Sequence, residues 1–227
     1  MAFSIGVVIV CAGKGKRLGG INKALLKLGG KPLFVYSLEV FLKLKFFKQI
    51  VLVMRKESFS AARKYITDKR VELTEGGRQR RDSVLKGLKA LSRGINYVLV
   101  HDAARPFISA KEVAAIIKEL KKHPAVICGI QPVDTLKNCR KNQIRETLNR
   151  DNVICAQTPQ GFKTNILRMA YEKFPKKNFT DDAQAVERLK VKVKVAQGQR
   201  SNFKITYPQD IELAKIILKR RGRKTRN

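Results

Sequence analysis

The sequence has few of the residues from which metal sites and disulfide scaffolds are built. Its 227 residues include four cysteines and two histidines. Cys11, Cys128, Cys139 and Cys155 form no CxxC pair and show no other close ligand spacing. This pattern argues against a structural zinc site and suits reduced thiols in the cytosol.

Long apolar runs are also missing. Residues 1–11 are mostly apolar, but the sequence Gly13-Lys14-Gly15-Lys16 follows directly. The run is too short to span a membrane, and it has no basic region of the kind that begins a signal peptide. We therefore expect a buried first strand and a cytoplasmic protein without membrane association.

Acidic residues are scarce, because 18 of them face 49 lysines and arginines, which gives a formal net charge of +31. Such an excess makes a basic nucleic-acid-binding protein an alternative. That class needs a recognisable module with aromatic residues among the basic ones, whereas aromatics make up 7% of the chain. The charge is spread over predicted helix faces and is concentrated only in residues 219–224. We favour solvated helix faces and a disordered basic tail over residues 219–227, and expect no specific nucleic-acid binding.

Short apolar runs alternate with segments of helical periodicity along most of the chain. Strands are predicted at residues 5–11, 50–54, 97–100, 126–130 and 153–157. Helices are predicted around residues 33–38, 82–91, 111–120 and 164–173, then from near Asp181 and from Pro208. Alternating valines at 191–195 and an apolar run at 203–206 continue the pattern. The alternation predicts one α/β domain over residues 1–218, with a mainly parallel sheet between helices. Ligands of such sheets bind beyond the carboxyl ends of the strands.

Residues 132–151 interrupt this alternation. The segment is polar and irregular, with Leu136, Ile144 and Leu148 as scattered apolar points. It predicts a projecting arm, such as a hairpin.

A glycine-rich turn follows the first predicted strand. Residues 11–20 read CAGKGKRLGG, and glycines there allow backbone N–H groups to approach phosphate oxygens. Arg17, Lys23 and the lysines between the glycines suit a triphosphate. Leu18 occupies the place of the third glycine of the dinucleotide pattern, which argues against a dinucleotide-dependent oxidoreductase, and the Walker A pattern is absent. On this segment alone, a solvated basic turn is the alternative.

Five segments in one unbroken order resemble those of the 2-C-methyl-D-erythritol 4-phosphate cytidylyltransferases, a family of sugar-nucleotide-type nucleotidyltransferases. They are AGKGKR at 12–17 with Lys23, GGRQRRDSV at 76–84, HDAARPF at 101–107, QTPQGF at 157–162, and TDD at 180–182 with NFKIT at 202–206. The resemblance covers residues 5–218. It implies a three-layer Rossmann-like fold with a projecting dimerisation arm. It also implies transfer of a cytidylyl group from CTP to 2-C-methyl-D-erythritol 4-phosphate, with release of pyrophosphate, in non-mevalonate isoprenoid precursor synthesis.

The resemblance also implies roles for single residues. Attack of a phosphate oxygen on the α-phosphorus of CTP brings two polyanions together, so the site needs fixed cations and N–H dipoles. Arg17 and Lys23 would stabilise the transition state, and Arg150 and Lys204 would position the sugar-alcohol phosphate. The implied nucleotide-binding residues are Ala12, Gly13, Lys14, Gly15, Gly77, Arg80, Ser83 and Ala103. The implied substrate-binding residues are Asp102, Arg105, Thr135, Thr158 and Thr180.

Two further expectations concern a metal ion and a second subunit. Asp102 ends a predicted buried strand and is the candidate to meet Mg²⁺ or a substrate hydroxyl, because triphosphate oxygens supply most of the shell of Mg²⁺. A cap on the following turn is the alternative role. By resemblance, the arm at 132–151 crosses to a partner subunit, so that Arg150 completes the neighbouring site of a homodimer.

The nearest alternative has the same fold and chemistry but acts on ribitol 5-phosphate. Ala103-Ala104 and the stretch Thr180-Asp181-Asp182 favour methylerythritol phosphate.

Overall fold

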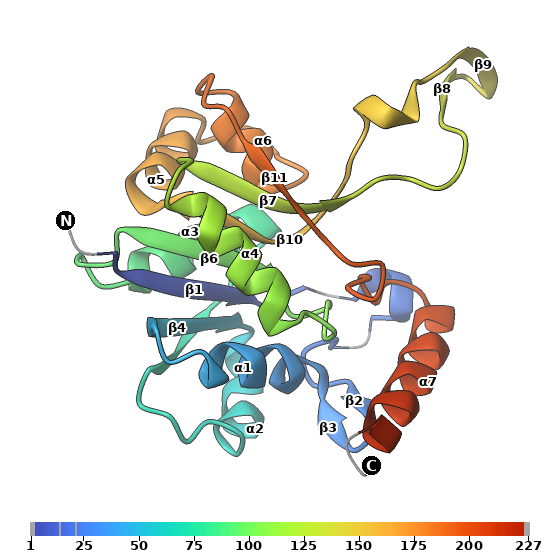
Figure 1. Cartoon of the computed structure of the whole chain (residues 1–227). Coiled ribbons are helices and arrows are strands. Elements are labelled where there is room, and N and C mark those ends of the chain that lie inside the picture. The colour runs from blue at the N-terminus through green and yellow to red at the C-terminus, as the bar shows by residue number, and fades with distance from the viewer. Residues whose placement is uncertain (1–2, 14, 21, 225–227) are drawn as a thin grey trace.

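A seven-stranded sheet forms the centre of the computed structural model, which describes residues 3–13, 15–20 and 22–224 (Figure 1). The strand order is β11-β7-β10-β6-β1-β4-β5. β10 runs antiparallel to β6 and β7, whereas the other pairs are parallel. The strands are β1 (Ile5–Val10), β4 (Phe47–Met54), β5 (Val71–Glu75), β6 (Tyr97–Asp102), β7 (Ala125–Ile130), β10 (Cys155–Lys163) and β11 (Lys194–Gln197).

Helices cover both faces of this sheet. One buried cluster joins it to α1 and α4, and a second joins it to α3, α5 and α6. The helices are α1 (Leu33–Lys43), α2 (Phe59–Arg63), α3 (Arg80–Ala90), α4 (Ala110–Leu120), α5 (Thr164–Lys173), α6 (Asp182–Glu187) and α7 (Pro208–Lys224). The predicted α/β class with three layers and a mainly parallel sheet is confirmed.

The sequence of α4 shows how these elements are specified locally. The helix begins with a capping box, in which Ser109 Oγ accepts from Glu112 N–H at 3.2 Å and Glu112 Oε2 accepts from Ser109 N–H at 3.0 Å. Both contacts satisfy backbone donors that the first turn leaves free. Val113, Ile116 and Leu120 then fall on one face and are buried.

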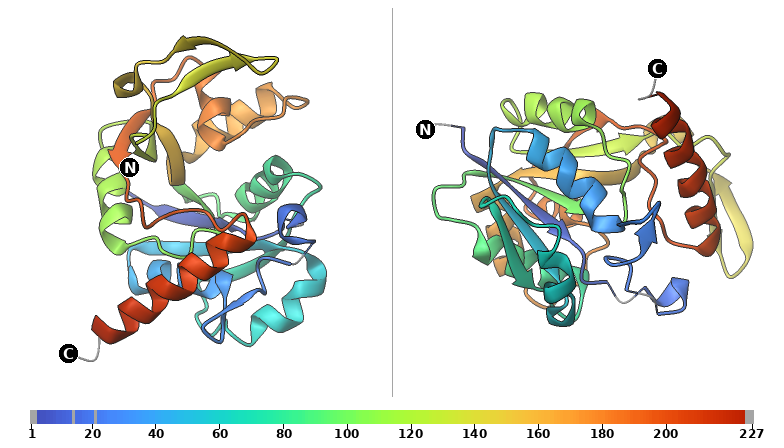
Figure 2. Two further views of the ribbon diagram at one scale, coloured as in Figure 1. Left: turned by 90° about the vertical axis from the view of Figure 1, so that its right-hand side faces the viewer. Right: turned by 90° about the horizontal axis from the view of Figure 1, so that it is seen from below.

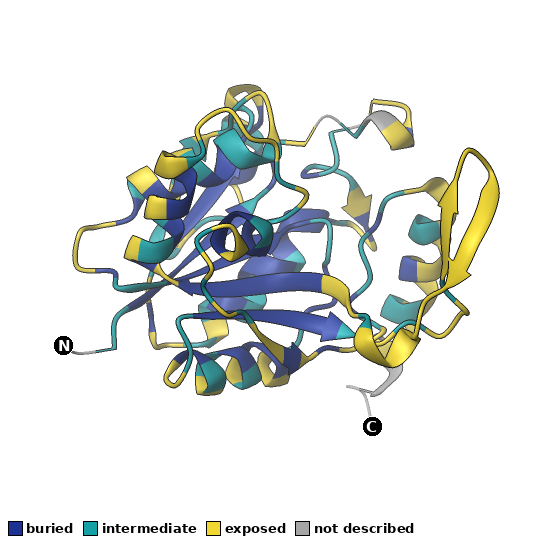
Figure 3. Cartoon of the chain, turned by 90° about the horizontal axis from the view of Figure 1, so that it is seen from above, coloured by how far each residue is buried: buried dark blue, intermediate teal, exposed yellow. Residues whose placement is uncertain are grey.

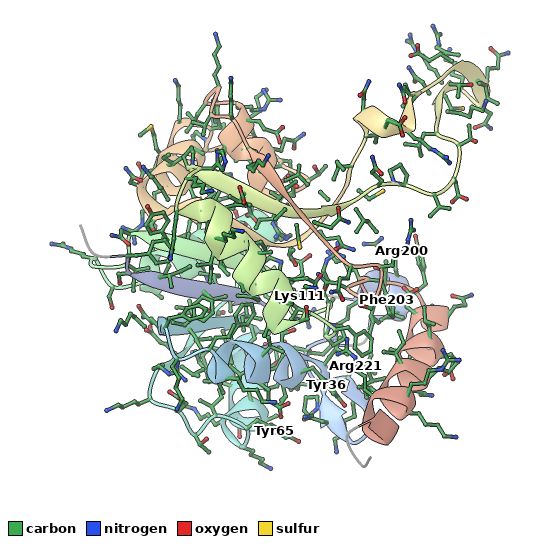
Figure 4. All side chains as sticks on the ribbon, viewed as in Figure 1. Tyr36, Tyr65, Lys111, Arg200, Phe203 and Arg221 are labelled. Carbon is green, nitrogen blue, oxygen red and sulfur yellow. The ribbon has the colours of Figure 1, made fainter. Side chains whose placement is uncertain are left out.

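Helix α7 lies beside the main layers (Figure 2). With the hairpin of β2 (Lys27–Leu28) and β3 (Lys31–Pro32), it encloses a third apolar cluster, which we call the brace cluster. Its buried members are Leu18, Leu28, Leu33, Phe107, Ile205 and Ala214. Phe203, labelled in Figure 4, packs on Phe107 with ring centroids 5.6 Å apart.

The segment 132–151 is the predicted projecting hairpin, formed by β8 (Lys137–Arg140) and β9 (Gln143–Thr147). Every residue of both strands is exposed, and the hairpin stands away from the sheet and its helices (Figures 1 and 3). The short helix η3 (Arg150–Asn152) leads from it to β10.

Several features differ from the sequence-based expectations, and α2 and the β2–β3 hairpin are among the elements that were not predicted. β5 was not predicted, because its sequence VELTE has two apolar residues and forms a half-buried edge strand. The apolar run at 203–206 forms no strand and crosses as a loop toward α7. Residues 219–224 of the basic tail, for which disorder was expected, are assigned to α7, and residues 225–227 lie outside the described residues.

The described helices include none that combines the length and the apolar character needed to cross a bilayer.

The close packing of α3 on the sheet predicts an outcome for Gly87→Ala. A Cβ at Gly87 would lie 2.4 Å from Val8 Cγ1 and 2.9 Å from Val53 Cγ2. Alanine favours helix by about 1 kcal/mol, but we expect overpacking to give a net destabilisation of about 1–3 kcal/mol. Urea unfolding measures this, with Gly94→Ala as control, because a Cβ there meets nothing within 4 Å. Equal stability of the two variants would contradict the packing argument.

Candidate active site

A cavity of about 1070 Å³ opens at the carboxyl ends of the parallel strands β1, β4, β5 and β6. Asp102 is the last residue of β6, and Gly76 and Gly77 follow β5. The glycine-rich turn follows β1 and lines the same cavity. This is the edge at which open α/β sheets bind ligands.

The glycine-rich turn folds back on itself beside this cavity. Gly15 has φ 60° and Gly19 φ 68°, a left-handed conformation that glycine adopts without a steric cost. The Gly15 carbonyl accepts from Leu18 N–H at 2.7 Å and from Gly20 N–H at 3.1 Å. Ala12, Gly13 and Gly15, which the family resemblance assigns to nucleotide binding, line the cavity, whereas Lys14 lies outside the described residues.

Three predicted cations converge on the cavity from distant parts of the chain. Arg17, Lys23 and Lys204 all line it. The Lys23 ammonium donates to the Ile205 carbonyl at 3.1 Å. Burial lowers the pKa of Lys23, and the neighbouring charges of Arg17 and Lys204 lower it further.

The brace cluster fixes the backbone that carries these cations. Leu18 and Ile205, which adjoin Arg17 and Lys204, are both buried in it. Arg17 and Lys204 therefore have flexible side chains on backbone segments that are held by apolar packing.

Asp102 is the buried acid among these cations. Its Oδ1 accepts from Arg80 Nε at 2.9 Å, and its Oδ2 accepts from Lys204 Nζ at 2.7 Å. Burial alone would raise the pKa of Asp102, but Arg80 and Lys204 outweigh it, so the pKa lies well below its ordinary value. The carboxylate is ionised at neutral pH.

The side of the cavity formed by residues 76–83 is shaped by close backbone contact. A Cβ on Gly76 would lie 2.2 Å from Ala12 Cβ, so only glycine fits where the two loops meet. Ser83 Oγ accepts from Gly77 N–H at 3.0 Å and donates to the Gln79 carbonyl at 3.1 Å. A hydroxyl oxygen has two lone pairs, so Ser83 keeps one acceptor position. Gly77, Arg80, Ser83 and Ala103, which the family resemblance assigns to nucleotide binding, all line the cavity.

Arg105 and Thr158 are predicted substrate-binding residues that the structure places behind the cavity lining. Thr158 Oγ1 accepts from Asp102 N–H at 3.1 Å and contacts His101 Nδ1 at 3.1 Å. Burial lowers the pKa of His101 to about 4, so the imidazole is neutral at physiological pH. Arg105 Nη1 donates to the Asn202 carbonyl at 2.8 Å. Both residues hold the lining in place in this structure.

Three other predicted residues lie apart from the cavity. Thr135 and Arg150 belong to the exposed arm, where Arg150 Nη1 donates to the Val133 carbonyl at 2.7 Å. Thr180 is exposed and its hydroxyl contacts Gln184 Oε1 at 3.5 Å, at the start of α6. A single chain therefore brings eleven of the predicted site residues to one cavity, but not these three.

Sequence reasoning missed several charged residues of the site. Arg55 and Lys86 line the cavity, and Lys86 Nζ donates to the Gly76 carbonyl at 3.0 Å. Asp182 received no role, although its carboxylate binds Arg80 at 2.7 Å. Its position in the TDD stretch was visible, but its burial was not.

The donor set of the site bears on a divalent cation. No cluster of three His, Cys, Asp or Glu residues suited to a metal ion occurs in the described part of the chain. Asp102 offers an ionised hard-oxygen ligand, but both of its oxygens are paired with cations. These residues fit Mg²⁺ only as an ion whose shell comes mainly from substrate phosphates.

The glycine turn, the converging cations and their place at the end of a parallel sheet define a nucleotidyltransferase of the α/β class. The chain belongs to the 2-C-methyl-D-erythritol 4-phosphate cytidylyltransferase (IspD) family, whose model matches residues 5–220. It is therefore a cytidylyltransferase, and the ribitol phosphate alternative is not favoured.

Individual relatives agree over almost the whole chain. The cytidylyltransferase of this name from Endomicrobium trichonymphae is 40% identical over 93% of this chain and 97% of its own. That from Bacillus mycoides is 37% identical over 93% and 96%. The crystal structure of 4-diphosphocytidyl-2C-methyl-D-erythritol synthase from Anaerococcus prevotii superposes with a TM-score of 0.86 at 33% identity, covering 95% of this chain and 98% of that chain.

The depressed pKa of Asp102 predicts how stability depends on pH. A carboxyl group whose pKa is lower in the folded state stabilises above its unfolded pKa of about 4, and this contribution is lost as pH falls toward the folded value. Between about pH 5 and pH 2.5, urea unfolding should show the wild type losing stability more steeply than Asp102→Asn, by up to about 1.4 kcal/mol per pH unit. Parallel pH profiles would contradict the ionised pair.

Proposed function

We propose that this chain transfers the cytidylyl group of CTP to 2-C-methyl-D-erythritol 4-phosphate, releasing pyrophosphate, as a step of isoprenoid precursor synthesis. The observation that carries the proposal is the convergence of Arg17, Lys23 and Lys204 on one cavity beside the glycine turn. The reaction would take place in the cytoplasm, which the four free cysteines suit.

The chemistry asks for positioning and charge stabilisation. A phosphate oxygen of the sugar alcohol attacks the α-phosphorus of CTP, a bond to that phosphorus forms, and the bond to the β-phosphate bridging oxygen breaks. Negative charge grows on the α-phosphoryl oxygens and on the leaving pyrophosphate. Arg17 and Lys23 would stabilise this charge, because fixed cations in a partly dry site act with little reorganisation.

The nucleotide would lie between the glycine turn and residues 76–83. Backbone N–H groups of Gly13 and Gly15 would meet phosphate oxygens. Ser83 Oγ, with one acceptor position left, would accept from the cytosine amino group. Ala12, Gly77 and Ala103 would contact the nucleotide through small side chains or bare backbone, with Arg80 and Lys14 supplying charge.

Lys204 and Asp102 would act on the sugar-alcohol phosphate side. The flexible Lys204 side chain can leave its ion pair with Asp102 and pair with the substrate phosphate instead. Asp102 Oδ2 would then be free to accept a hydrogen bond from a substrate hydroxyl. When bound, Mg²⁺ would neutralise triphosphate charge, held mainly by CTP with at most one oxygen of Asp102. Arg105 and Thr158 would complete the substrate pocket through the backbone they support. Thr180, which lies apart from the cavity of its own chain, would contribute only where a second subunit extends the pocket.

The exposed arm would give the remaining residues to a second subunit. Thr135 and Arg150 are fully formed parts of the hairpin yet do not line the cavity of their own chain. Arg150, at the start of η3, and the exposed apolar side chains of Val133 and Ile144 suit a contact with another copy of the chain. In a homodimer, Arg150 of each subunit would then complete the site of its neighbour.

The proposed function is tested by incubating the purified protein with CTP and Mg²⁺ and measuring pyrophosphate release. Release should require methylerythritol phosphate, and ribitol 5-phosphate offered in parallel should be a poor substrate. Equal or better use of ribitol 5-phosphate would overturn the choice of substrate, and no release with either would overturn the reaction.

Lys23→Ala should lower kcat by about 10²–10³, the typical effect of removing one charge-stabilising donor. The Lys23 ammonium lines the cavity beside Arg17, so its loss removes charge where the leaving group forms. Steady-state kinetics with both substrates varied measures this. A change confined to KM would show that Lys23 binds only ground-state CTP.

Mixed dimers test whether Arg150 acts across subunits. Lys23→Ala and Arg150→Ala are each expected to be nearly inactive. If the arm completes the neighbouring site, a mixed dimer has one intact site, so co-refolding equal amounts should restore about one quarter of wild-type activity. If Arg150 acts within its own chain, the mixture stays inactive.

A further inference from the structure

A chain of charged side chains leads from the protein interior to the cavity. The Tyr171 hydroxyl donates to Asp182 Oδ1 at 2.5 Å, and Arg80 Nη2 donates to Asp182 Oδ2 at 2.7 Å. Arg80 Nε then donates to Asp102 Oδ1 at 2.9 Å, and Lys204 Nζ donates to Asp102 Oδ2 at 2.7 Å. We call these five residues, Tyr171, Asp182, Arg80, Asp102 and Lys204, the buried charge chain.

The two ends of the buried charge chain differ in exposure. The Asp182 side chain at the inner end is 0% exposed and that of Lys204 at the cavity 38%, while those of Arg80 and Asp102 between them are 25% and 10% exposed. Two carboxylates and two cations cancel in formal charge, which is how ionised groups are tolerated in a protein interior. The charge of each residue in the chain is therefore balanced by its neighbours, so a change at Asp182 alters the pairing of Arg80, and a change at Arg80 alters the pairing of Asp102.

Arg80 is held from two sides by different carboxylates. Its Nε and Nη2 are engaged by Asp102 and Asp182, and its remaining N–H donors have no partner within the described ranges, while the residue lines the cavity. A planar guanidinium fixed along one edge has one orientation. Because Asp182 supplies one of the two fixed contacts, Arg80 needs only one oxygen of Asp102, and the other stays with Lys204.

We propose that Asp182, held by Tyr171, is a positioning residue that fixes Arg80 and, through Asp102, keeps Lys204 at the cavity until an anionic substrate takes it. The inference rests on the proposed function, since it gives Lys204 a substrate phosphate to meet. If the charge of Asp182 is removed, two cations compete for the single carboxylate of Asp102. Arg80 then claims both oxygens, and Lys204 loses its partner.

The test measures Lys204 directly, without substrate. An amine reacts with acetic anhydride only when it is free of its proton, and pairing with a carboxylate protects it. Limited acetylation followed by peptide mass spectrometry should show Lys204 of Asp182→Asn reacting about three- to tenfold faster than in the wild type, the scale of effect of losing a compensating charge. Lys31, paired on the surface with Glu39 at 2.8 Å, is the internal reference.

Matched variants separate this role from general loosening. Asp181→Asn removes the same charge one residue away. Asparagine keeps the cap of α6, in which Oδ1 accepts from Gln184 N–H at 2.9 Å, and loses only the hydrogen bond that Oδ2 accepts from Gln160 Nε2 at 2.7 Å. This variant should leave Lys204 reactivity unchanged. Asp102→Asn removes the partner itself and should raise Lys204 reactivity at least as much as Asp182→Asn does.

Tyr171→Phe keeps the inference testable if Asp182→Asn does not fold. It removes one hydrogen bond to Asp182 but keeps both acids, and should raise Lys204 reactivity about two- to threefold, a smaller effect in the same direction. With substrates, Asp182→Asn should lower kcat/KM for the sugar-alcohol phosphate about tenfold, with Asp181→Asn near wild type.

Unchanged Lys204 reactivity in the folded Asp182→Asn and Tyr171→Phe variants, with a clear rise in Asp102→Asn, would overturn the positioning role. Failure of the proposed function is a separate result: the wild type would release no pyrophosphate, whatever the acetylation pattern.

Discussion

The paired carboxylate of Asp102 is the interaction on which the site depends. It stands at the end of β6, which lies beside β1 in the sheet, and this adjacency brings it next to the glycine turn. Arg80 reaches it from α3 and Lys204 from the loop before α7. Without this acid, Lys204 would lose its carboxylate partner and Arg80 would keep only Asp182, and two partly buried cations side by side are costly unless they are paired. One carboxylate thus lets the fold place positive charge where two anionic substrates must meet.

Apolar packing supplies the second constraint. The cations of the site stand on loops, which are usually the most mobile parts of a domain. Here the brace cluster holds the two loops together: Leu18 and Ile205 are buried in it beside Ala214 of α7, and Lys23 bonds to the Ile205 carbonyl. Helix α7 therefore stabilises the geometry of the cavity, although none of its residues whose side chains are described lines it.

Local patterns were enough to predict most strands of the buried sheet, most helices around it and the basic glycine-rich turn, whereas most of the residues that line the cavity were predicted only through the family resemblance. An apolar run such as that of β1 is stable only when it is buried in the sheet. A glycine such as Gly76 marks a position where a Cβ does not fit. The edge strand β5 was not predicted from the sequence, because a half-buried strand needs few apolar residues. The helical state of residues 219–224 was also not predicted. These residues only continue α7, which packs on the brace cluster through earlier residues such as Ala214. The link from Asp182 to Arg80 joins residues 102 apart and depends on burial, which no local pattern records.

The charge of the protein divides into a local part with a structural reason and a diffuse part without one. Among the residues that the structure describes, eight lysines and arginines and three acids line the cavity, an excess that suits two polyanionic ligands. Most of the +31 of the whole chain is not accounted for by these residues. Such a field attracts anions over a distance of roughly 10 Å at moderate salt and speeds their arrival, but it does not choose among them. Selection of particular substrates requires hydrogen-bond donors at fixed positions. Those donors are held by the ion pairs of Asp102 with Arg80 and Lys204 and by the brace cluster.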